Sequence, residues 1–146
     1  MRVRIVAIGT RMPDWVTTAY EDYTRRLRGT LRVDLDELPV GRGKADEQKR
    51  LLERVGDDYL VALDEHGKTR TTLELAKWLD ERIQDGRNLC FVIGGPNGLG
   101  PEILARAAMR WSLSPLTFPH AMVRVILAEQ LYRAHSVLHN HPYHRE

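Results

Sequence analysis

Hydrophobic residues along this chain fall into alternating stretches with the spacing of strands and of helices. Residues 2–9 are mostly apolar and β-branched and close with a glycine, as a buried opening strand does. Pro13 follows, and its fixed φ suits the first turn of a helix that we expect to reach Leu27. The residues that recur at every fourth position and predict the buried stripe of this helix are Trp15, Ala19, Tyr23 and Leu27.

The middle of the chain predicts two further strands and two helices. Residues 31–36 alternate between apolar and charged, the pattern of a half-exposed strand at the periphery of a sheet. A basic loop at 41–44 precedes a predicted helix over 45–55, and residues 59–64 predict a third strand. Thr71, with a glutamate three residues later, forms a capping box for a helix through residue 84.

The last part of the chain contains the predicted centre of the sheet. Residues 88–93 are continuously apolar, which is typical of a strand buried on both faces of a parallel sheet. The glycine-rich segment 94–100 follows, and Pro101 opens the next helix. Residues 111–118 predict a short extended segment, and 121–138 a final helix. This alternation favours a mostly parallel sheet with helices on both faces.

Length and composition limit the possible classes of protein. With 146 residues, of which 42% are hydrophobic, we expect a single α/β domain over 1–146 with no separate RNA-binding domain. Lys and Arg number 22 against 20 Asp and Glu, so no whole-molecule field indicates a polyanionic partner, although residues 42–54 are locally basic. The lone Cys90 excludes an intrachain disulfide and favours a reducing compartment, and no apolar run is long enough for a signal or a membrane span. We therefore expect a cytoplasmic protein without a membrane partner.

Two segments are candidates for chemistry. The first is the glycine-rich turn after the predicted central strand, where a ligand can approach the backbone without obstruction by Cβ atoms, although a plain tight turn fits the same spacing. It is not a dinucleotide fingerprint, because the third glycine position holds Ile103. Gly67-Lys68-Thr69 is not a Walker loop, because the required earlier glycine is Ala62.

The second segment is the extended run 111–120. Free backbone groups of such a loop can bind the edge of an adenine, and Leu113, Leu116 and Phe118 offer apolar walls. A buried loop that packs on the sheet is the alternative interpretation.

Both segments, in this order, resemble the SPOUT methyltransferases, and most closely the ribosomal RNA large subunit methyltransferase H family. The resemblance covers the chain from end to end, although residues 42–60 look shorter than is usual for that family. The blocks that carry it are Val6-Ala7-Ile8-Gly9-Thr10, Met12-Pro13-Asp14-Trp15, Ile93 to Leu99, Ser112 to His120, Arg124 to Ala134 and His141-Pro142-Tyr143-His144-Arg145.

The resemblance implies a fold with a carboxyl-terminal deep trefoil knot, which sequence rules alone would not propose because true knots are rare. It also implies a homodimer that uses S-adenosyl-L-methionine, without a metal, to methylate N3 of pseudouridine 1915 in 23S rRNA of the ribosome. The cofactor-binding residues that it implies are Leu63, Gly94, Gly95, Leu113, Ser114, Pro115, Leu116, Thr117 and Phe118.

Five residues in the family motifs are candidates for catalysis. Loss of the imide proton from pseudouridine N3 calls for a base, and His120 and His144 titrate near neutrality. Arg124 and Arg145 are candidate cations for the carbonyl oxygens that gain negative charge, and Tyr143 is a candidate to stack on the target base.

Other interpretations compete with these. A zinc ion held by His139, His141 and His144 would need a geometry that Pro142 disrupts, so we expect no metal. The whole chain could instead be a non-catalytic RNA-binding protein or a nucleotide-binding enzyme that acts on small molecules. The tryptophans, which we expect in the core or at a dimer contact, are Trp15, Trp78 and Trp111.

Overall fold

The computed structural model describes residues 1–27 and 31–145 and contains one five-stranded sheet with helices on both sides. The strands are β1 (Val3–Ile8), β2 (Val33–Leu38), β3 (Tyr59–Thr69), β4 (Leu89–Ile93) and β5 (Met109–Ser112). The helices are α1 (Asp14–Arg26), α2 (Lys44–Val55), α3 (Thr72–Asp85), α4 (Pro101–Arg106), α5 (His120–Leu138) and the 3-10 turn η1 (Pro142–Arg145). None of the helices in these two ranges is long and apolar enough to cross a bilayer.

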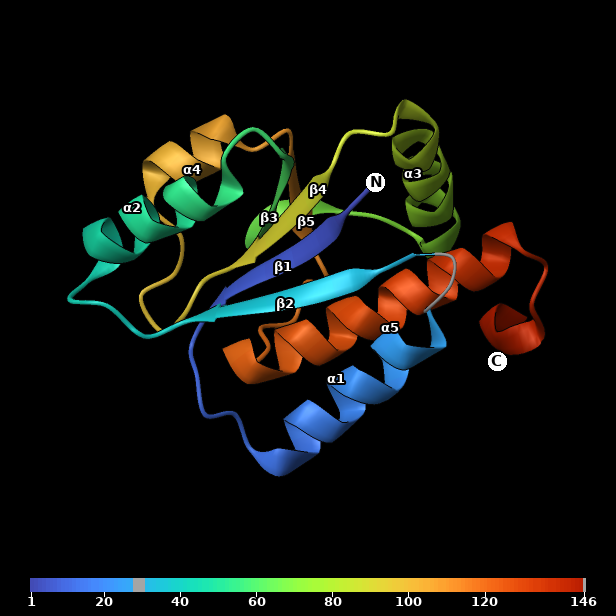
Figure 1. Cartoon of the computed structure of the whole chain (residues 1–146), viewed down its shortest axis with the longest axis horizontal. Coiled ribbons are helices and arrows are strands. Elements are labelled where there is room, and N and C mark those ends of the chain that lie inside the picture. Colours follow the sequence, from blue (N-terminus) through green and yellow to red (C-terminus); the bar gives the residue numbers. More distant parts are fainter. Residues whose placement is uncertain (28–30, 146) are drawn as a thin grey trace.

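All strand pairs of the sheet are parallel, in the order β2-β1-β4-β3-β5 (Figure 1). This confirms the mostly parallel sheet that the alternation of elements predicted. β4 is the central strand, and all five of its residues are buried, as its continuous apolar sequence predicted. β2 lies at one edge of the sheet, which agrees with its half-exposed alternating pattern.

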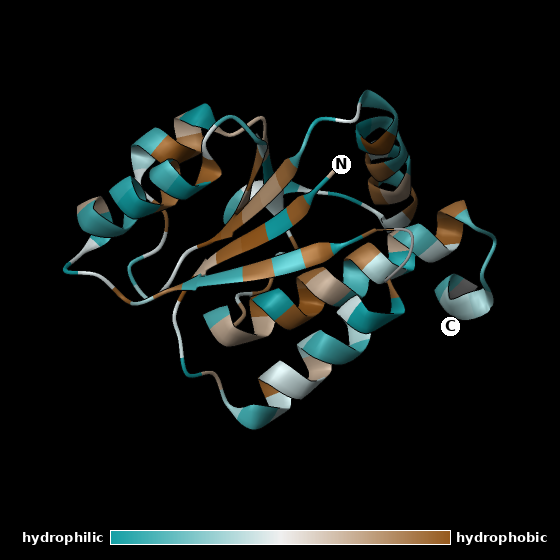
Figure 2. Cartoon of the chain, viewed as in Figure 1, coloured by the Kyte–Doolittle hydropathy of each residue, from teal (hydrophilic) through white to brown (hydrophobic). Residues whose placement is uncertain are grey.

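Successive side chains of the inner strands enter two separate cores. On β4, Phe91 packs towards α1, α3 and α5, whereas Cys90 and Val92 pack towards α2 and α4. Figure 2 shows the hydrophobic strands between the two layers of amphipathic helices. Because Cys90 is fully buried, burial raises the pKa of its thiol to about 12, which leaves it protonated and unreactive at neutral pH.

Three sequence predictions need correction. β3 continues to Thr69 instead of ending at residue 64, because it resumes pairing with β5 after an irregularity. The extended segment predicted over 111–118 pairs only as far as Ser112, and the rest of it is a loop. On α1 the buried side chains are Val16 and Tyr20, whereas in the predicted stripe Leu27, directly after the helix, is buried, and Ala19 and Tyr23 are half-buried.

Trp15 is therefore 55% exposed on the surface of α1 and does not belong to the core, and its other expected place, a dimer contact, stays a prediction. Two sets of apolar residues on this helix satisfy the same four-residue spacing, and the pattern alone does not choose between them. Trp78 and Trp111 do belong to the core region, in a chain of ring contacts through Phe91.

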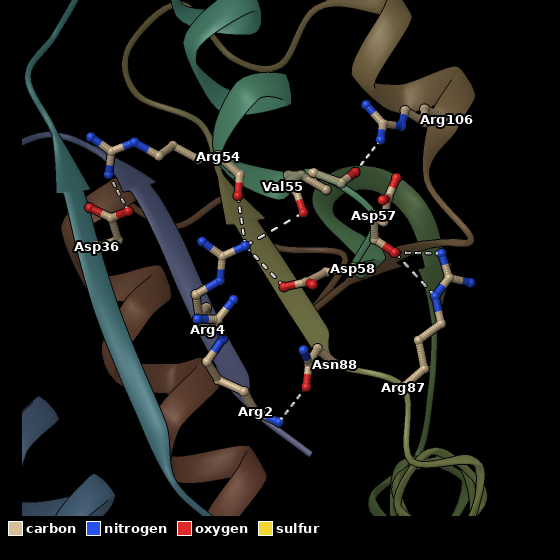
Figure 3. A network of polar contacts seen from close by, with 11 residues as sticks. Arg2, Arg4, Asp36, Arg54, Val55, Asp57, Asp58, Arg87, Asn88 and Arg106 are labelled. Atoms are coloured by element: carbon tan, nitrogen blue, oxygen red, sulfur yellow. Dashed lines mark hydrogen bonds and ion pairs between the residues drawn. The ribbon is translucent and has the colours of Figure 1, made fainter.

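A polar network closes the amino end of the sheet, opposite the carboxyl ends of the strands (Figure 3). Arginines from β1, from α4 and from the connection before β4 donate to carbonyl oxygens at the end of α2 and in the turn directly after it. Arg4 donates to the Arg54 carbonyl at 2.6 Å and to the Asp58 carboxylate at 2.9 Å, and Arg87 donates to the Asp57 carbonyl at 2.8 Å. These carbonyls have no partner within the helix, and cations near them also favour its dipole.

Replacing Arg4 by Met should lower the free energy of unfolding by about 1.5–3 kcal/mol, because the change removes hydrogen bonds from a charged donor. Urea unfolding measures this difference. Arg2→Met on the same strand end is the matched control, since its exposed side chain should matter by less than about 0.5 kcal/mol. Equal effects of the two changes would contradict the assigned role of the network.

Candidate functional site

The carboxyl ends of the parallel strands meet at one edge of the sheet, where sheets of this kind bind ligands. β4 ends at Ile93, and the turn 94–100 follows it. A Cβ on Gly95 would lie only 2.7 Å from Cγ2 of Ile8 at the end of β1, and Gly98 has a φ of 71°. Glycine at these positions lets the turn pack directly on β1 and keeps its backbone open to a ligand.

A bulge in β3 forms the next wall. Trp111 of β5 pairs with both Leu63 and Lys68, so residues 64–67 leave the ladder at this point. The displaced segment carries Asp64, Glu65 and His66, which line the same space as the glycine turn. Two carboxylates and a histidine therefore stand at the carboxyl edge of the sheet.

The loop after β5 closes the space from the third side. It is held by its own side chains: Ser112 Oγ donates to the Ser114 carbonyl at 2.9 Å, and Leu116 N donates to Ser114 Oγ at 3.0 Å. Thr117 Oγ1 donates to the Glu65 carboxylate at 3.1 Å, which ties this loop to the bulge of β3.

Together these three segments form a cleft of two adjoining hollows, with volumes of about 580 and 80 Å³. Of the nine residues predicted to bind cofactor, those that line it are Leu63, Gly94, Gly95, Leu113, Ser114, Leu116, Thr117 and Phe118. Pro115 lies in the same loop but does not line either hollow. Lining residues that the sequence analysis missed include Lys44, Asp64, Glu65, His66, Leu99 and Val123. Asp64, Glu65 and His66 could have been predicted from the sequence, because they are polar residues at the end of a buried strand.

The two hollows differ in chemistry. The smaller one is walled by Leu63, Trp111, Leu113 and Phe118, together with backbone of the loop, and suits a flat aromatic group. The larger one combines the open backbone of the glycine turn with the carboxylates of the β3 bulge and suits a polar group that carries positive charge.

Comparison with known proteins agrees with this geometry. Residues 1–144 match the family model described as predicted SPOUT methyltransferase. The chain is 51% identical to the ribosomal RNA large subunit methyltransferase H of Alkalilimnicola ehrlichii, over 99% of both chains, and 51% identical to that of Thioalkalivibrio sulfidiphilus, over 100% of both. The chain belongs to the SPOUT methyltransferases. Within them it belongs to the ribosomal RNA large subunit methyltransferase H family.

Solved structures support the fold of this SPOUT methyltransferase. A methylase family protein of Haemophilus influenzae Rd KW20 matches with a TM-score of 0.61 and 16% identity, over 97% of this chain and 69% of that one. The SpoU methyltransferase AviRb of Streptomyces viridochromogenes, solved in complex with AdoMet, matches with a TM-score of 0.50 and 12% identity, over 92% of this chain and 58% of that one. The predicted knotted α/β fold class is thus confirmed.

The SPOUT methyltransferase uses S-adenosyl-L-methionine, and the cleft fits this cofactor. The apolar hollow suits its adenine, and the glycine turn leaves free the space that Cβ atoms at Gly94 and Gly95 would narrow. Asp64 and Glu65 supply negative charge where the cofactor carries an ammonium and a sulfonium. When bound, the cofactor supplies a methyl group that is already activated for transfer.

Two predicted catalytic residues lie at the start of α5 but in different surroundings. His120 lines the larger hollow, and a Cβ on Gly9 would lie 3.8 Å from its ring. Arg124, one turn later, is 2% exposed, pairs with Glu37 and donates to the Gly9 carbonyl at 3.3 Å. The structure therefore places His120 at the cleft and Arg124 behind it. Their roles in catalysis stay predictions.

The predicted tail residues lie at the other end of α5 (Figure 1). Tyr143 contacts Tyr132 with ring centroids 4.6 Å apart and the rings tilted by 56°, and its hydroxyl donates to the Glu129 carboxylate at 3.0 Å. Partial burial and hydrogen bonds with Tyr23 and Glu129 raise the pKa of Tyr143, so it stays protonated. His144 is half-buried in the same turn, and the side chain of Arg145 lies outside the described part of the chain.

A single chain therefore does not bring the five predicted catalytic residues together. α5 has 19 residues, so at 1.5 Å per residue its two ends are about 28 Å apart. The histidines of the tail form no metal site either, since the described residues contain no cluster of three or more metal-binding side chains.

Gly95→Ala should weaken S-adenosylmethionine binding by at least about tenfold, because the added Cβ would meet the buried Ile8 side chain and displace the turn. Calorimetry with the cofactor measures this loss. The control Glu102→Ala, at an exposed residue of α4 that lines neither hollow, should change the affinity less than threefold, or about 0.6 kcal/mol. Unchanged affinity in Gly95→Ala would remove the turn from the cofactor site.

Proposed function

We propose that this enzyme methylates N3 of a pseudouridine in 23S rRNA, acting on the ribosome in the cytoplasm as a homodimer. The observation that carries the proposal is a cofactor cleft in a chain that is 51% identical, over its full length, to proteins named ribosomal RNA large subunit methyltransferase H. The proposal includes the single-domain organisation predicted from the sequence. In this proposal the single domain recognises its substrate as a shaped assembly.

Attack of the base nitrogen on the activated methyl group needs no metal, so positioning is the main task of the protein. Orientation alone can supply about 7–11 kcal/mol of the barrier. His120 lines the cleft and is placed to accept the imide proton that N3 loses. Basic side chains on the cleft rim, such as Lys44, suit the phosphates of RNA.

In a homodimer, the partner subunit can supply the tail residues that the cleft of a single chain lacks. Tyr143 and His144 are far from the cleft of their own chain, so we propose that the tail enters the active site of the partner subunit. Apolar side chains on α1 and α5 support such pairing: Trp15 is 55% exposed, and Met122, Val125 and Ile126 are partly exposed. An isologous dimer would then contain two equivalent composite sites.

The decisive experiment is mass mapping of methyl groups on 23S rRNA from cells that lack this protein. We expect one methylated pseudouridine to lose its methyl group and to regain it when the wild-type gene is returned. A gene with His120→Ala should not restore it, because the cleft then lacks its base. Persistence of every methylated pseudouridine in the deleted strain would refute the proposed substrate.

The composite site predicts complementation between two inactive variants. His120→Ala keeps an intact tail, and Tyr143→Ala keeps an intact cleft, so half of the dimers in an equal mixture contain one complete site of two. Methyl transfer by the mixture should therefore recover to about a quarter of the wild-type rate. In the control mixture of His120→Ala with His120→Ala/Tyr143→Ala, every cleft lacks its histidine, so methyl transfer should not recover. A mixture of the two single variants that stays inactive would show that each chain completes its own site.

A further inference from the structure

A separate cavity lies beside the cofactor cleft, between α1, β2 and the first turns of α5. Its volume is about 210 Å³, which is smaller than a typical drug-sized site, and it shares no lining residue with the two hollows of the cleft. Its lining includes the apolar Met12, Val16 and Leu35 and the polar Tyr20, Glu37 and Arg124.

Two buried donors on the wall of this cavity have no hydrogen-bond partner among the described residues. They are Nε of Arg124, whose residue is 2% exposed, and the hydroxyl of Tyr20, whose residue is 6% exposed. Burial is the main cause that raises the pKa of Tyr20, so its hydroxyl keeps its proton and remains a donor. Buried donors without an acceptor are unfavourable and rare in folded proteins, so this pair indicates a missing acceptor.

The charges around the cavity restrict what that acceptor is. The guanidinium of Arg124 is already neutralised by its pair with Glu37, and Glu21 also lines the cavity. An anion would therefore meet more negative than positive charge. The carboxylate of Glu37 still has lone pairs for another donor. The cavity thus offers two donors, one acceptor and apolar walls to a neutral ligand.

We propose that this cavity binds a uracil-type base of the RNA substrate that neighbours the methylated one. The edge of uracil or pseudouridine presents two carbonyl oxygens and an N–H group, which match the donors Tyr20 and Arg124 and the acceptor Glu37. Cytosine presents an amino group in place of one carbonyl and leaves a buried donor unpaired. The inference rests on the proposed RNA substrate and adds a second base site to it.

The position of the cavity relative to the cleft supports this assignment. Gly9 separates the two: a Cβ there would lie 3.1 Å from Met12 of the cavity and 3.8 Å from His120 of the cleft. Two residues after Gly9, the exposed Arg11 holds a φ of 56°, a conformation that is unfavourable without a compensating role. An RNA strand that passes over this segment would present adjacent bases to the two sites.

Tyr20→Phe tests the site without removing any hydrogen bond that the described residues make. We expect KM for rRNA to rise roughly five- to tenfold through loss of one donor, with kcat at saturating RNA, cofactor affinity and melting temperature unchanged. Tyr59→Phe, near α3 on the same face of the sheet but outside the cavity lining, is the matched control and should leave KM unchanged. An unchanged KM for rRNA in Tyr20→Phe overturns the proposal. A change in the dimer dissociation constant alone also overturns it, because the cavity would then bind a side chain of the partner subunit.

A second measurement separates this inference from the proposed substrate. The Nε–H resonance of Arg124 in ¹⁵N-labelled protein should shift on titration with uridine 5′-monophosphate, and much less with the cytidine nucleotide. If the resonance shifts with the uridine nucleotide but the protein does not methylate 23S rRNA, the base site is supported and the proposed substrate is refuted. Equal responses to both nucleotides, or none, would refute the base site.

Discussion

The parallel direction of all five strands is the constraint on which the rest of this structure depends. Parallel pairing places the carboxyl ends of β1, β3 and β4 along one edge, and burial of β4 on both faces fixes that edge in the middle of the molecule. Every wall of the cofactor cleft starts there: the glycine turn follows β4, the acidic bulge belongs to β3, and the loop after β5 returns across both. An antiparallel pair would separate these segments.

The two ends of the sheet have opposite roles. At the amino end, Arg4 and Arg87 bind carbonyl oxygens and carboxylates at the end of α2, so their donors are used within the protein (Figure 3). At the carboxyl end, glycine backbone and the carboxylates of the β3 bulge remain available to a ligand. These arginines are therefore not free to bind the phosphates of RNA.

The long helix α5 connects the two halves of the proposed chemistry. Its first turns place His120 at the cleft and Arg124 behind Gly9, whereas its last turns hold the tail through Glu129 and Tyr132. The Tyr143 contacts fix the tail against its own helix, so a rigid helix and not a flexible tail sets where these residues are displayed. A dimer can therefore present them to a second cleft without reordering a loop.

The elements, the parallel sheet and its central strand could be predicted from the amino-acid sequence, and the family and the cofactor loops followed by resemblance. These features depend on local periodicity and on motifs of adjacent residues, which is why eight of the nine residues predicted to bind cofactor line the cleft. Three features emerged from the packing of the folded chain: Trp15 faces outward, β3 bulges to bring Asp64 and Glu65 to the cleft, and Arg124 is buried against Glu37. Those outcomes depend on which neighbouring element packs on a residue, and contacts between residues far apart in sequence leave no periodic pattern in the chain.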